Sequence, residues 1–284
     1  MWRGCRSNRR SRGSGTIAVP HVGTGWAIPR CLSSMSRGVL NILSLHAMLF
    51  PANERIASVD SMTSPTPTGH ADVIIYDLDG VITTRDSFAA LIVEQLRKAP
   101  LRFLRALPAA MAMFLGVNEE WKRQAAARVT AIAFAGMRDY EYAALATAFG
   151  IRIGDDPSWI RASTAERIRR QKADGAWIII ATATERRLAE SLLEQASVPY
   201  DSLSASLLTE TACGVEVDDH RVGQRKADAL REQGIAIHDA EFVTDSMTDL
   251  PTARLAARVT LIGASQKTRE RYSRRGISPT EVTP

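Results

Sequence analysis

From residue 72 onward, short runs of apolar, β-branched residues alternate with stretches of helical periodicity. The runs are VIIYD at 73–77, WIIIA at 177–181, EFVT at 241–244 and RVTLI at 258–262. Helical patterns accompany the last three runs at residues 185–196, 224–233 and 248–257. Strands that alternate with helices favour a parallel sheet with helices on both faces. The sequence therefore predicts an α/β fold with a doubly wound, Rossmann-like parallel sheet, whose functional site lies at the carboxyl ends of the strands.

A long helical segment separates the first run from the second. The interval is far longer than one strand-to-strand crossover needs. Helical patterns fill it at residues 87–97, 101–115, 119–135, 139–149 and 158–172, with a kink expected at Pro108. We therefore expect an all-helical subdomain at residues 87–157, inserted into a core made of residues 71–86 and 158–284. Four aromatic residues are expected in the interior of that subdomain: Trp121, Phe134, Tyr140 and Tyr142.

The positive charge of the chain is concentrated at its N-terminal end. Residues 1–70 hold eight arginines and two acids, whereas residues 71–284 carry 28 basic and 29 acidic side chains. The sequence pI of about 9.4 therefore gives little support to nucleic-acid binding by the folded part. We expect residues 1–70 to be a disordered basic extension that ends in the Pro/Thr-rich linker SMTSPTPTGH.

The same N-terminal region contains one apolar stretch, at residues 38–50. It is shorter than the roughly 20 residues that a membrane span requires, so no membrane span is predicted. A signal peptide starting at Met35, an Arg-rich transit peptide and a true start at Met62 are alternative interpretations, of which we favour the last. Three cysteines without metal-ligand spacing cannot form a disulfide framework, and a cytoplasmic location fits them best.

The string Asp77-Leu78-Asp79-Gly80 follows the first predicted strand directly. Two carboxylates at a strand end, followed by a glycine for a tight turn, can act on one reacting atom: one attacks and the other moves a proton. A turn with two solvated aspartates is the alternative interpretation.

Three further groups of polar residues occur at predicted strand ends or helix starts. Thr182 follows WIIIA, where a hydroxyl and free backbone N–H groups could bind phosphate oxygens, or where Thr182 could simply cap a helix. Lys226 opens a helix, which is unfavourable for a cation unless an anion is nearby; a solvated lysine is the alternative. Asp245 and Asp249 follow EFV and could complete an oxygen-rich pocket for Mg²⁺, or could only cap a helix.

Together these strings resemble a known family. DLDGV, the ATAT around Thr182, the GQRK at Lys226 and the DSMTD ending at Asp249 resemble the four ordered motifs of the haloacid dehalogenase superfamily of aspartate-nucleophile phosphatases. The helical insertion resembles the type-one cap of that superfamily, and DSMTDLPTARLA is most similar to its phosphoserine-phosphatase-like branch. The resemblance extends from residue 71 to about residue 275.

This resemblance implies a Mg²⁺-dependent phosphatase acting on a small phosphomonoester. Asp77 would be the nucleophile that forms an aspartyl-phosphate, and Asp79 would be the general acid and base. Thr182 and Lys226 would hold the phosphate oxygens. Mg²⁺ would be bound by Asp77, the backbone carbonyl of Asp79 and Asp245, with support from Asp249. A phosphomutase of the same superfamily and a non-catalytic metal- or phosphate-binding module are the alternatives.

Two departures argue against a dedicated phosphoserine phosphatase. Asp86 stands where those enzymes carry a glutamate. Arg128 and Val129 resemble their Arg–Val pair in the cap, but Gly136 comes two residues late. The simplest interpretation of Arg128 is an exposed residue of a cap helix.

Overall fold

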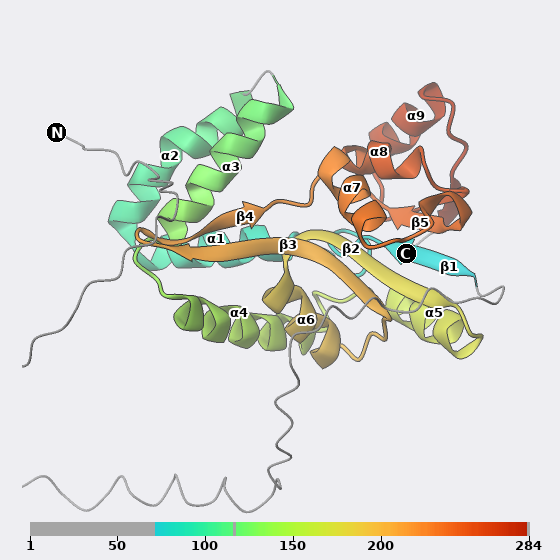
Figure 1. The fold of residues 1–284 in the computed structure, drawn as a ribbon, viewed down its shortest axis with the longest axis horizontal. Coiled ribbons are helices and arrows are strands. Elements are labelled where there is room, and N and C mark those ends of the chain that lie inside the picture. Colours follow the sequence, from blue (N-terminus) through green and yellow to red (C-terminus); the bar gives the residue numbers. More distant parts are fainter. Residues whose placement is uncertain (1–71, 116–117, 283–284) are drawn as a thin grey trace, which may run out of the picture. The chain divides into compact units, whose positions relative to one another are not determined.

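The computed structural model describes residues 72–115 and 118–282, and within them a seven-stranded sheet has the order β4-β3-β2-β1-β5-β6-β7 (Figure 1). The strands are β1 Val73–Tyr76, β2 Trp177–Glu185, β3 Ser202–Thr211, β4 Gly214–Asp219, β5 Glu241–Thr244, β6 Arg258–Ile262 and β7 Thr280–Val282. Neighbouring strands are parallel, except that β3 and β4 form an antiparallel pair. The predicted α/β fold with a doubly wound parallel sheet is confirmed.

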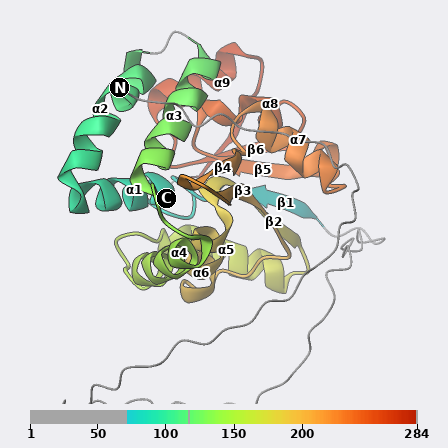
Figure 2. The same cartoon turned by 60° about the vertical axis from the view of Figure 1, so that its left-hand side comes forward.

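Helices cover both faces of the sheet. They are α1 Ser87–Lys98, α2 Pro100–Leu115, α3 Glu119–Ala133, α4 Asp139–Gly154, α5 Ala162–Ala173, α6 Arg186–Gln195, α7 Gln224–Glu232, α8 Leu250–Ala253 and α9 Gln266–Arg274. Figures 1 and 2 show α4, α5 and α6 on one face and α7, α8 and α9 on the other. The sheet therefore forms the middle of three layers.

The residues of β1 show how the sheet divides the hydrophobic core in two. Successive side chains of a strand point to opposite faces. Ile74 and Tyr76 therefore belong to the cluster that includes α5 and α6, whereas Ile75 belongs to the cluster under α7 and α9. All three are buried. Because both faces are covered, β1 is apolar throughout rather than alternating with polar residues.

Helices α1 to α3 stand apart from the layers. Figures 1 and 2 show α2 and α3 side by side and directed away from the sheet, with α1 at their base. By contrast, α4 packs closely on α6: a Cβ atom placed on Gly150 would lie 2.2 Å from the Ser191 Oγ atom. The division of the chain into a cap at 87–157 and a core remains a prediction, and the last helix of that segment packs with the core.

Three strands were not predicted from the sequence: β3, β4 and β7. Strand β2 also continues to Glu185, so the predicted helix at 185–196 begins one residue later, at Arg186. The predicted helix at 248–257 is a 3₁₀ turn, Met247–Asp249, followed by the four-residue α8. Helix α2 continues through Pro108.

The aromatic residues of the cap divide into two pairs. Phe134 and Tyr142 are buried as predicted, with ring centroids 5.0 Å apart in an edge-to-face contact. The prediction is wrong for Trp121 and Tyr140, which are 65% and 72% exposed. Both lie in the first turn of a helix, on a side of that turn that faces solvent. The predicted disordered extension, its apolar stretch and the start at Met62 lie outside the described residues.

Candidate active site

The register of the sheet brings the predicted site residues to one edge. The residue before Asp77 pairs with Ile180 of β2 and with Val243 of β5. Asp77 follows, and its backbone N–H donates to the carbonyl oxygen of Val243 at 2.9 Å. Thr182 and Asp245 lie two residues beyond these partners, Thr182 within the last part of β2 and Asp245 directly after β5. Segments more than 100 residues apart in the sequence therefore meet around Asp77.

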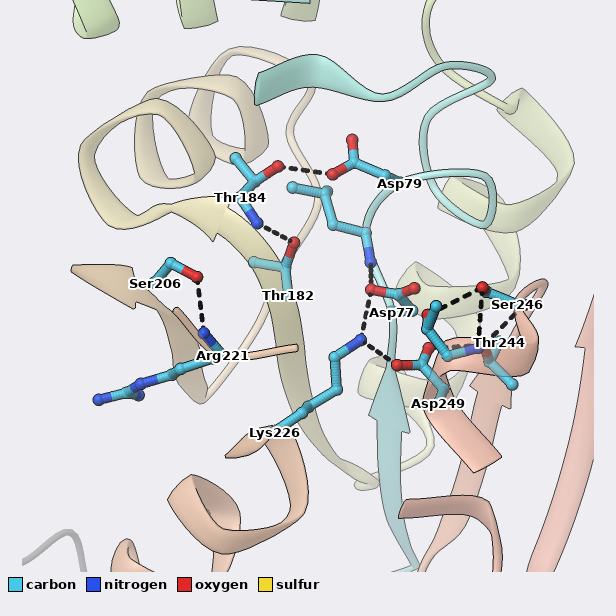
Figure 3. A network of polar contacts seen from close by, with 12 residues as sticks. Asp77, Asp79, Thr182, Thr184, Ser206, Arg221, Lys226, Thr244, Ser246 and Asp249 are labelled. Atoms are coloured by element: carbon cyan, nitrogen blue, oxygen red, sulfur yellow. Dashed lines mark hydrogen bonds and ion pairs between the residues drawn. The ribbon is translucent and has the colours of Figure 1, made fainter. Parts of the chain in front are cut away.

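Lys226 crosses from α7 to this edge (Figure 3). Its Nζ atom lies 3.0 Å from Asp77 Oδ1 and 2.7 Å from Asp249 Oδ1, and its side chain is 2% exposed. Burial lowers the pKa of Lys226, but attraction to Asp249 and Asp77 outweighs this effect, so the pKa is raised overall. Lys226 is therefore a buried, charged lysine, and its interpretation as a solvated side chain is wrong.

Asp249 is the second carboxylate that forms an ion pair with Lys226. It lies at the end of the 3₁₀ turn after β5 and is almost fully buried. Its second carboxylate oxygen, Oδ2, accepts a hydrogen bond from Thr244 Oγ1 at 2.7 Å. Thr244 is the last residue of β5, so a strand end fixes the acid that positions the lysine.

The carboxyl groups at this edge carry more negative charge than one lysine offsets. Burial raises the pKa of Asp77 well above its ordinary value; Lys226 opposes this effect, and Asp249 and Asp79 add to it. Burial and the charge of Asp249 likewise raise the pKa of Asp245 to about 6. Asp77 and Asp249 therefore contact the one ammonium group, and Asp79 and Asp245 lie near enough for the acids to influence one another's pKa.

Asp79 is held by hydroxyl groups that the sequence analysis did not identify as part of the site. Its Oδ1 atom accepts from Thr83 Oγ1 at 3.1 Å and from both the backbone N and the Oγ of Ser87, at 2.9 and 2.8 Å. Its Oδ2 atom accepts from Thr184 Oγ1 at 2.5 Å. Figure 3 shows the Asp79 carboxylate directed toward Thr184 rather than toward Asp77. Burial raises the pKa of Asp79, while these hydrogen bonds oppose the rise.

Ser87 links the loop that carries Asp79 to α1, because Ser87 is the first residue of that helix. Asp79 is thus connected both to the first helix of the cap and, through Thr184, to β2. The signal for Ser87 and Thr184 in the sequence was weak: a serine at a helix start and a threonine at a strand end are common capping and strand residues.

Thr182 occupies a different local structure from the one predicted. It lies inside β2 rather than at a helix start, and the N-cap of α6 is Glu185, whose side chain accepts from Leu188 N at 3.2 Å. The interpretation of Thr182 as a helix cap is therefore wrong. Its Oγ1 atom accepts a hydrogen bond from Thr184 N at 3.0 Å and lies on the Asp77 side of β2 (Figure 3).

The acids at this edge fit a divalent cation by their chemistry. In the described residues, no three His, Cys, Asp or Glu side chains are arranged to hold a metal ion by themselves. Mg²⁺ does not need such a cage, because it is commonly bound by one or two carboxylates, with water and substrate phosphate as the other ligands. Gly80 brings the loop close to Asp245: it has φ +80°, and a Cβ atom there would lie 2.2 Å from Asp245 Oδ2. The excess of buried carboxyl groups over ammonium groups provides the charge that such a cation would neutralise.

Comparisons with known proteins place this site in a family. Residues 74–254 match the model of the family described as haloacid dehalogenase-like hydrolase. The match covers more than half of the chain and contains the four acids of the site together with Thr182 and Lys226. The chain belongs to the haloacid dehalogenase-like hydrolases. The resemblance seen in the sequence is thereby confirmed, and the protein is a hydrolase of this superfamily.

Solved structures share the fold of this hydrolase. A protein of unknown function from Bordetella pertussis Tohama I superposes with a TM-score of 0.59 at 20% identity, over 74% of this chain and 98% of that one. A probable phosphoserine phosphatase from Vibrio cholerae gives a TM-score of 0.53 at 16% identity, over 75% of this chain and 60% of that one. A HAD family hydrolase from Salmonella enterica serovar Typhi gives 0.52 at 14% identity, over 74% and 67%. None of the curated proteins matches the sequence.

Two residues considered for substrate specificity are exposed. Asp86 is exposed and caps α1, accepting from Ala89 N at 2.8 Å. Arg128 is exposed on α3, in agreement with its interpretation as a surface residue of the cap.

Proposed function

We propose that this hydrolase is a Mg²⁺-dependent phosphatase that cleaves a small phosphomonoester through an aspartyl-phosphate. The observation that carries the proposal is the buried Asp77 carboxylate at the end of the central strand, in contact with the buried ammonium group of Lys226. Such a pair provides a nucleophile and a cation for a phosphoryl group at the same point. Family membership supports the same chemistry.

In this proposal Asp77 and Asp79 have separate roles. A carboxylate oxygen of Asp77 attacks phosphorus, the bond from phosphorus to the ester oxygen breaks, and the leaving oxygen takes a proton from Asp79. Asp79 then removes a proton from water, which attacks the aspartyl-phosphate and releases phosphate and Asp77. Because Asp79 is bonded to Thr184 and Ser87 in this structure, it must turn from these donors to reach the leaving group.

The remaining residues bind rather than react. Lys226 and the Thr182 hydroxyl hold non-bridging phosphate oxygens. Mg²⁺ would be held by Asp77, the backbone carbonyl of Asp79 and Asp245, with Asp249 in support, and when bound it supplies charge neutralisation for the phosphoryl group. Asp249 also sets the position of Lys226 through their 2.7 Å ion pair.

We propose that the substrate is a small phosphorylated metabolite and that phosphoserine is a poor one. Asp86 is shorter than glutamate and is already engaged as the cap of α1. Arg128 is exposed on α3.

No helix in the described part of the chain is long and apolar enough to cross a membrane. We further propose a cytoplasmic location, and we assign no role to nucleic acid.

The two aspartates provide the decisive experiment. Asp77→Asn should abolish hydrolysis of an aryl phosphate, because an amide does not attack phosphorus at a useful rate. Asp79→Asn should release a burst of phenol and then turn over very slowly, because an aryl leaving group needs little protonation whereas the attack of water has lost its base. In the Asp79→Asn variant, phosphate should be recovered covalently bound to Asp77.

The control for this experiment is Asp228→Asn, which removes a partly exposed carboxylate on α7 that pairs with Arg231 and should leave activity unchanged. Equal loss without a burst in both variants would contradict the two-step assignment. Phosphate transferred back to an organic acceptor, without release of inorganic phosphate, would indicate a mutase. Absence of any turnover or phosphorylation by the parent with Mg²⁺ would favour a non-catalytic binding module.

A further inference from the structure

Helix α2 has the reverse of the usual amphipathic arrangement. Leu101, Leu104, Leu107, Met111 and Leu115 recur every three or four residues and so form one stripe along the helix. Each of these five side chains is between 41% and 74% exposed. The large apolar residues of α2 therefore face solvent, and a helix of a globular domain buries such a stripe.

The opposite side of α2 makes the contacts that hold this helix in the fold. That side carries small residues, of which Ala106 is buried and Ala109 and Ala110 are packed against the core. They belong to the same cluster as Val129 and Ala133 of α3. The α2–α3 pair, meaning Pro100–Leu115 and Glu119–Ala133, is thus held together by its alanine-rich faces. Trp121 of α3 adds a further large apolar side chain that is 65% exposed.

The charge of this region differs in sign from that of the rest of the folded part. Residues 97–128 contain seven basic and two acidic side chains, whereas the remainder of 71–284 contains 21 basic and 27 acidic ones. Helix α2 itself holds two arginines and no acid. Arg97, in the last turn of α1, and Arg105, next to Leu104 on α2, are exposed and form no ion pair within the described part of the chain.

These observations select among the possible occupants of the stripe. A second copy would bring an equally basic α2–α3 pair to the contact. Residues 1–70, with eight arginines and two acids, would also be repelled. A convex ridge of leucine and methionine with a tryptophan and flanking arginines matches the interface of a bilayer with anionic headgroups. Sixteen residues of helix span about 24 Å, less than the roughly 30 Å of a hydrocarbon core, so α2 would lie along the surface and not cross it.

We propose that the α2–α3 pair docks the protein on an anionic lipid surface, with the leucine and methionine stripe of α2 in the headgroup region. This docking goes beyond the proposed phosphatase activity and does not depend on it. Burial of the stripe supplies the apolar part of the attraction, and Arg97 and Arg105 supply part of the electrostatic attraction.

The test is flotation of the full chain with vesicles, compared between variants. Vesicles of phosphatidylcholine with about one third phosphatidylglycerol should carry the parent protein upward, and added salt should weaken this binding. Leu104→Glu combined with Met111→Glu should reduce the partition coefficient by at least about tenfold. Arg97→Gln combined with Arg105→Gln should reduce it by about fivefold for each arginine.

Matched controls separate the stripe from other effects. Tyr140→Glu combined with Ile151→Glu makes the same change in charge and apolarity on α4, at residues that are 72% and 45% exposed, and should bind vesicles as the parent does. The α2 double variant and the α4 double variant should both leave hydrolysis of a water-soluble aryl phosphate unchanged. Asp77→Asn should still float, so that a failure of the proposed catalysis is distinguishable from a failure of docking.

A local measurement completes the test, because residues 1–70 could also bind anionic vesicles. Amide hydrogen exchange in residues 100–115 should slow when anionic vesicles are added. Equal flotation of the parent and the α2 variant, or unchanged exchange in α2, would overturn the proposal. So would an oligomer of the parent that Leu104→Glu with Met111→Glu dissociates, because the occupant would then be a second copy.

Discussion

Asp79 is bonded to donors from three segments, which partly offset a rise in its pKa. Burial and the charge of Asp86 raise the pKa of Asp79, and the hydroxyl of Thr184 is the donor that lowers it most. The Thr184 Oγ1 to Asp79 Oδ2 distance of 2.5 Å is short for a hydrogen bond between two oxygens, as expected for a charged acceptor. A residue on β2 thus lowers the pKa of Asp79, the proposed general acid on the loop after β1.

Thr184→Val should shift the pH dependence of the reaction. Loss of a hydrogen bond to the charged form raises the pKa of Asp79, so the acid stays protonated to higher pH. We expect the alkaline limb of kcat/KM for an alkyl phosphate to move upward by about 1 pH unit. Thr209→Val, at an exposed position of β3, should leave the profile unchanged. A lower kcat with an unmoved limb would show that Thr184 acts other than through the pKa of Asp79.

At the scale of elements, Asp219 connects the end of β4 to α7. It accepts from Arg225 Nε at 2.7 Å and Nη2 at 2.9 Å, and from Arg221 Nε at 3.0 Å. The hydrogen bond from Arg225 is the main reason that the pKa of Asp219 is lowered. Because α7 carries Lys226, this connection supports the helix on which the site lysine depends.

Asp219→Asn should destabilise the fold by about 1–2 kcal/mol at pH 7. A carboxyl whose pKa is lowered by folding stabilises the fold fully above its unfolded pKa of about 3.9, and this contribution is lost as pH falls further through the folded value. The difference in unfolding free energy between parent and variant should therefore shrink as pH falls below about 4. Urea unfolding over a pH series measures it. A difference that stays constant into the acid range would contradict an electrostatic origin.

The contact of α4 with α6 depends on two glycines. A Cβ atom on Gly150 would lie 2.2 Å from Ser191 Oγ and 2.9 Å from the Leu188 carbonyl oxygen, and one on Gly154 would lie 2.8 Å from the Leu192 carbonyl oxygen. Small residues at these positions let the two helices approach each other closely.

Gly150→Ala should therefore lower stability although alanine is the better helix former. The propensity gain is about 1 kcal/mol, whereas overpacking against a backbone carbonyl costs about 1–3 kcal/mol, and the cost should win. Adding Ser191→Ala removes the nearest contact and should recover part of the loss in a thermal melt. A more stable Gly150→Ala variant would mean that α4 moves away from α6 without penalty.

The predictions from sequence succeeded where structure is local and failed where it depends on distant partners. β1 (VIIY) is a continuous apolar run, and β5 (EFVT) and β6 (RVTLI) contain short apolar, β-branched segments, which favour buried parallel strands. β3 contains the buried serines Ser204 and Ser206, whose burial is satisfied by Arg221: its Nη1 donates to Ser204 Oγ at 3.1 Å and its backbone N to Ser206 Oγ at 2.9 Å. No local pattern reveals that partner.

The same distinction holds for the candidate site. Asp77, Asp249 and Lys226 stand in motifs with recognisable spacing, and the parallel register then brings them together. Ser87 and Thr184 reach Asp79 only because the first turn of α1 and the end of β2 converge in the fold. Their hydroxyls have no distinguishing sequence pattern, so only the structure identifies them.

At the scale of the whole molecule, a chain that starts at Met62 should keep the stability and activity of the full chain. The residues from Ser64 onward form one unit by their own contacts, and the family match at 74–254 and every proposed site residue lie within it. We expect the melting temperature to change by less than about 2 °C, since no described core contact is removed. Turnover of an aryl phosphate should be unchanged.

As a comparison, a chain that ends at Ser278 loses β7, which pairs with β6 and places Val282 against the hydrophobic core, so its melting temperature should fall. Aggregation or a lower melting temperature of the Met62 chain, with the full chain intact, would show that residues 1–61 contribute to the fold.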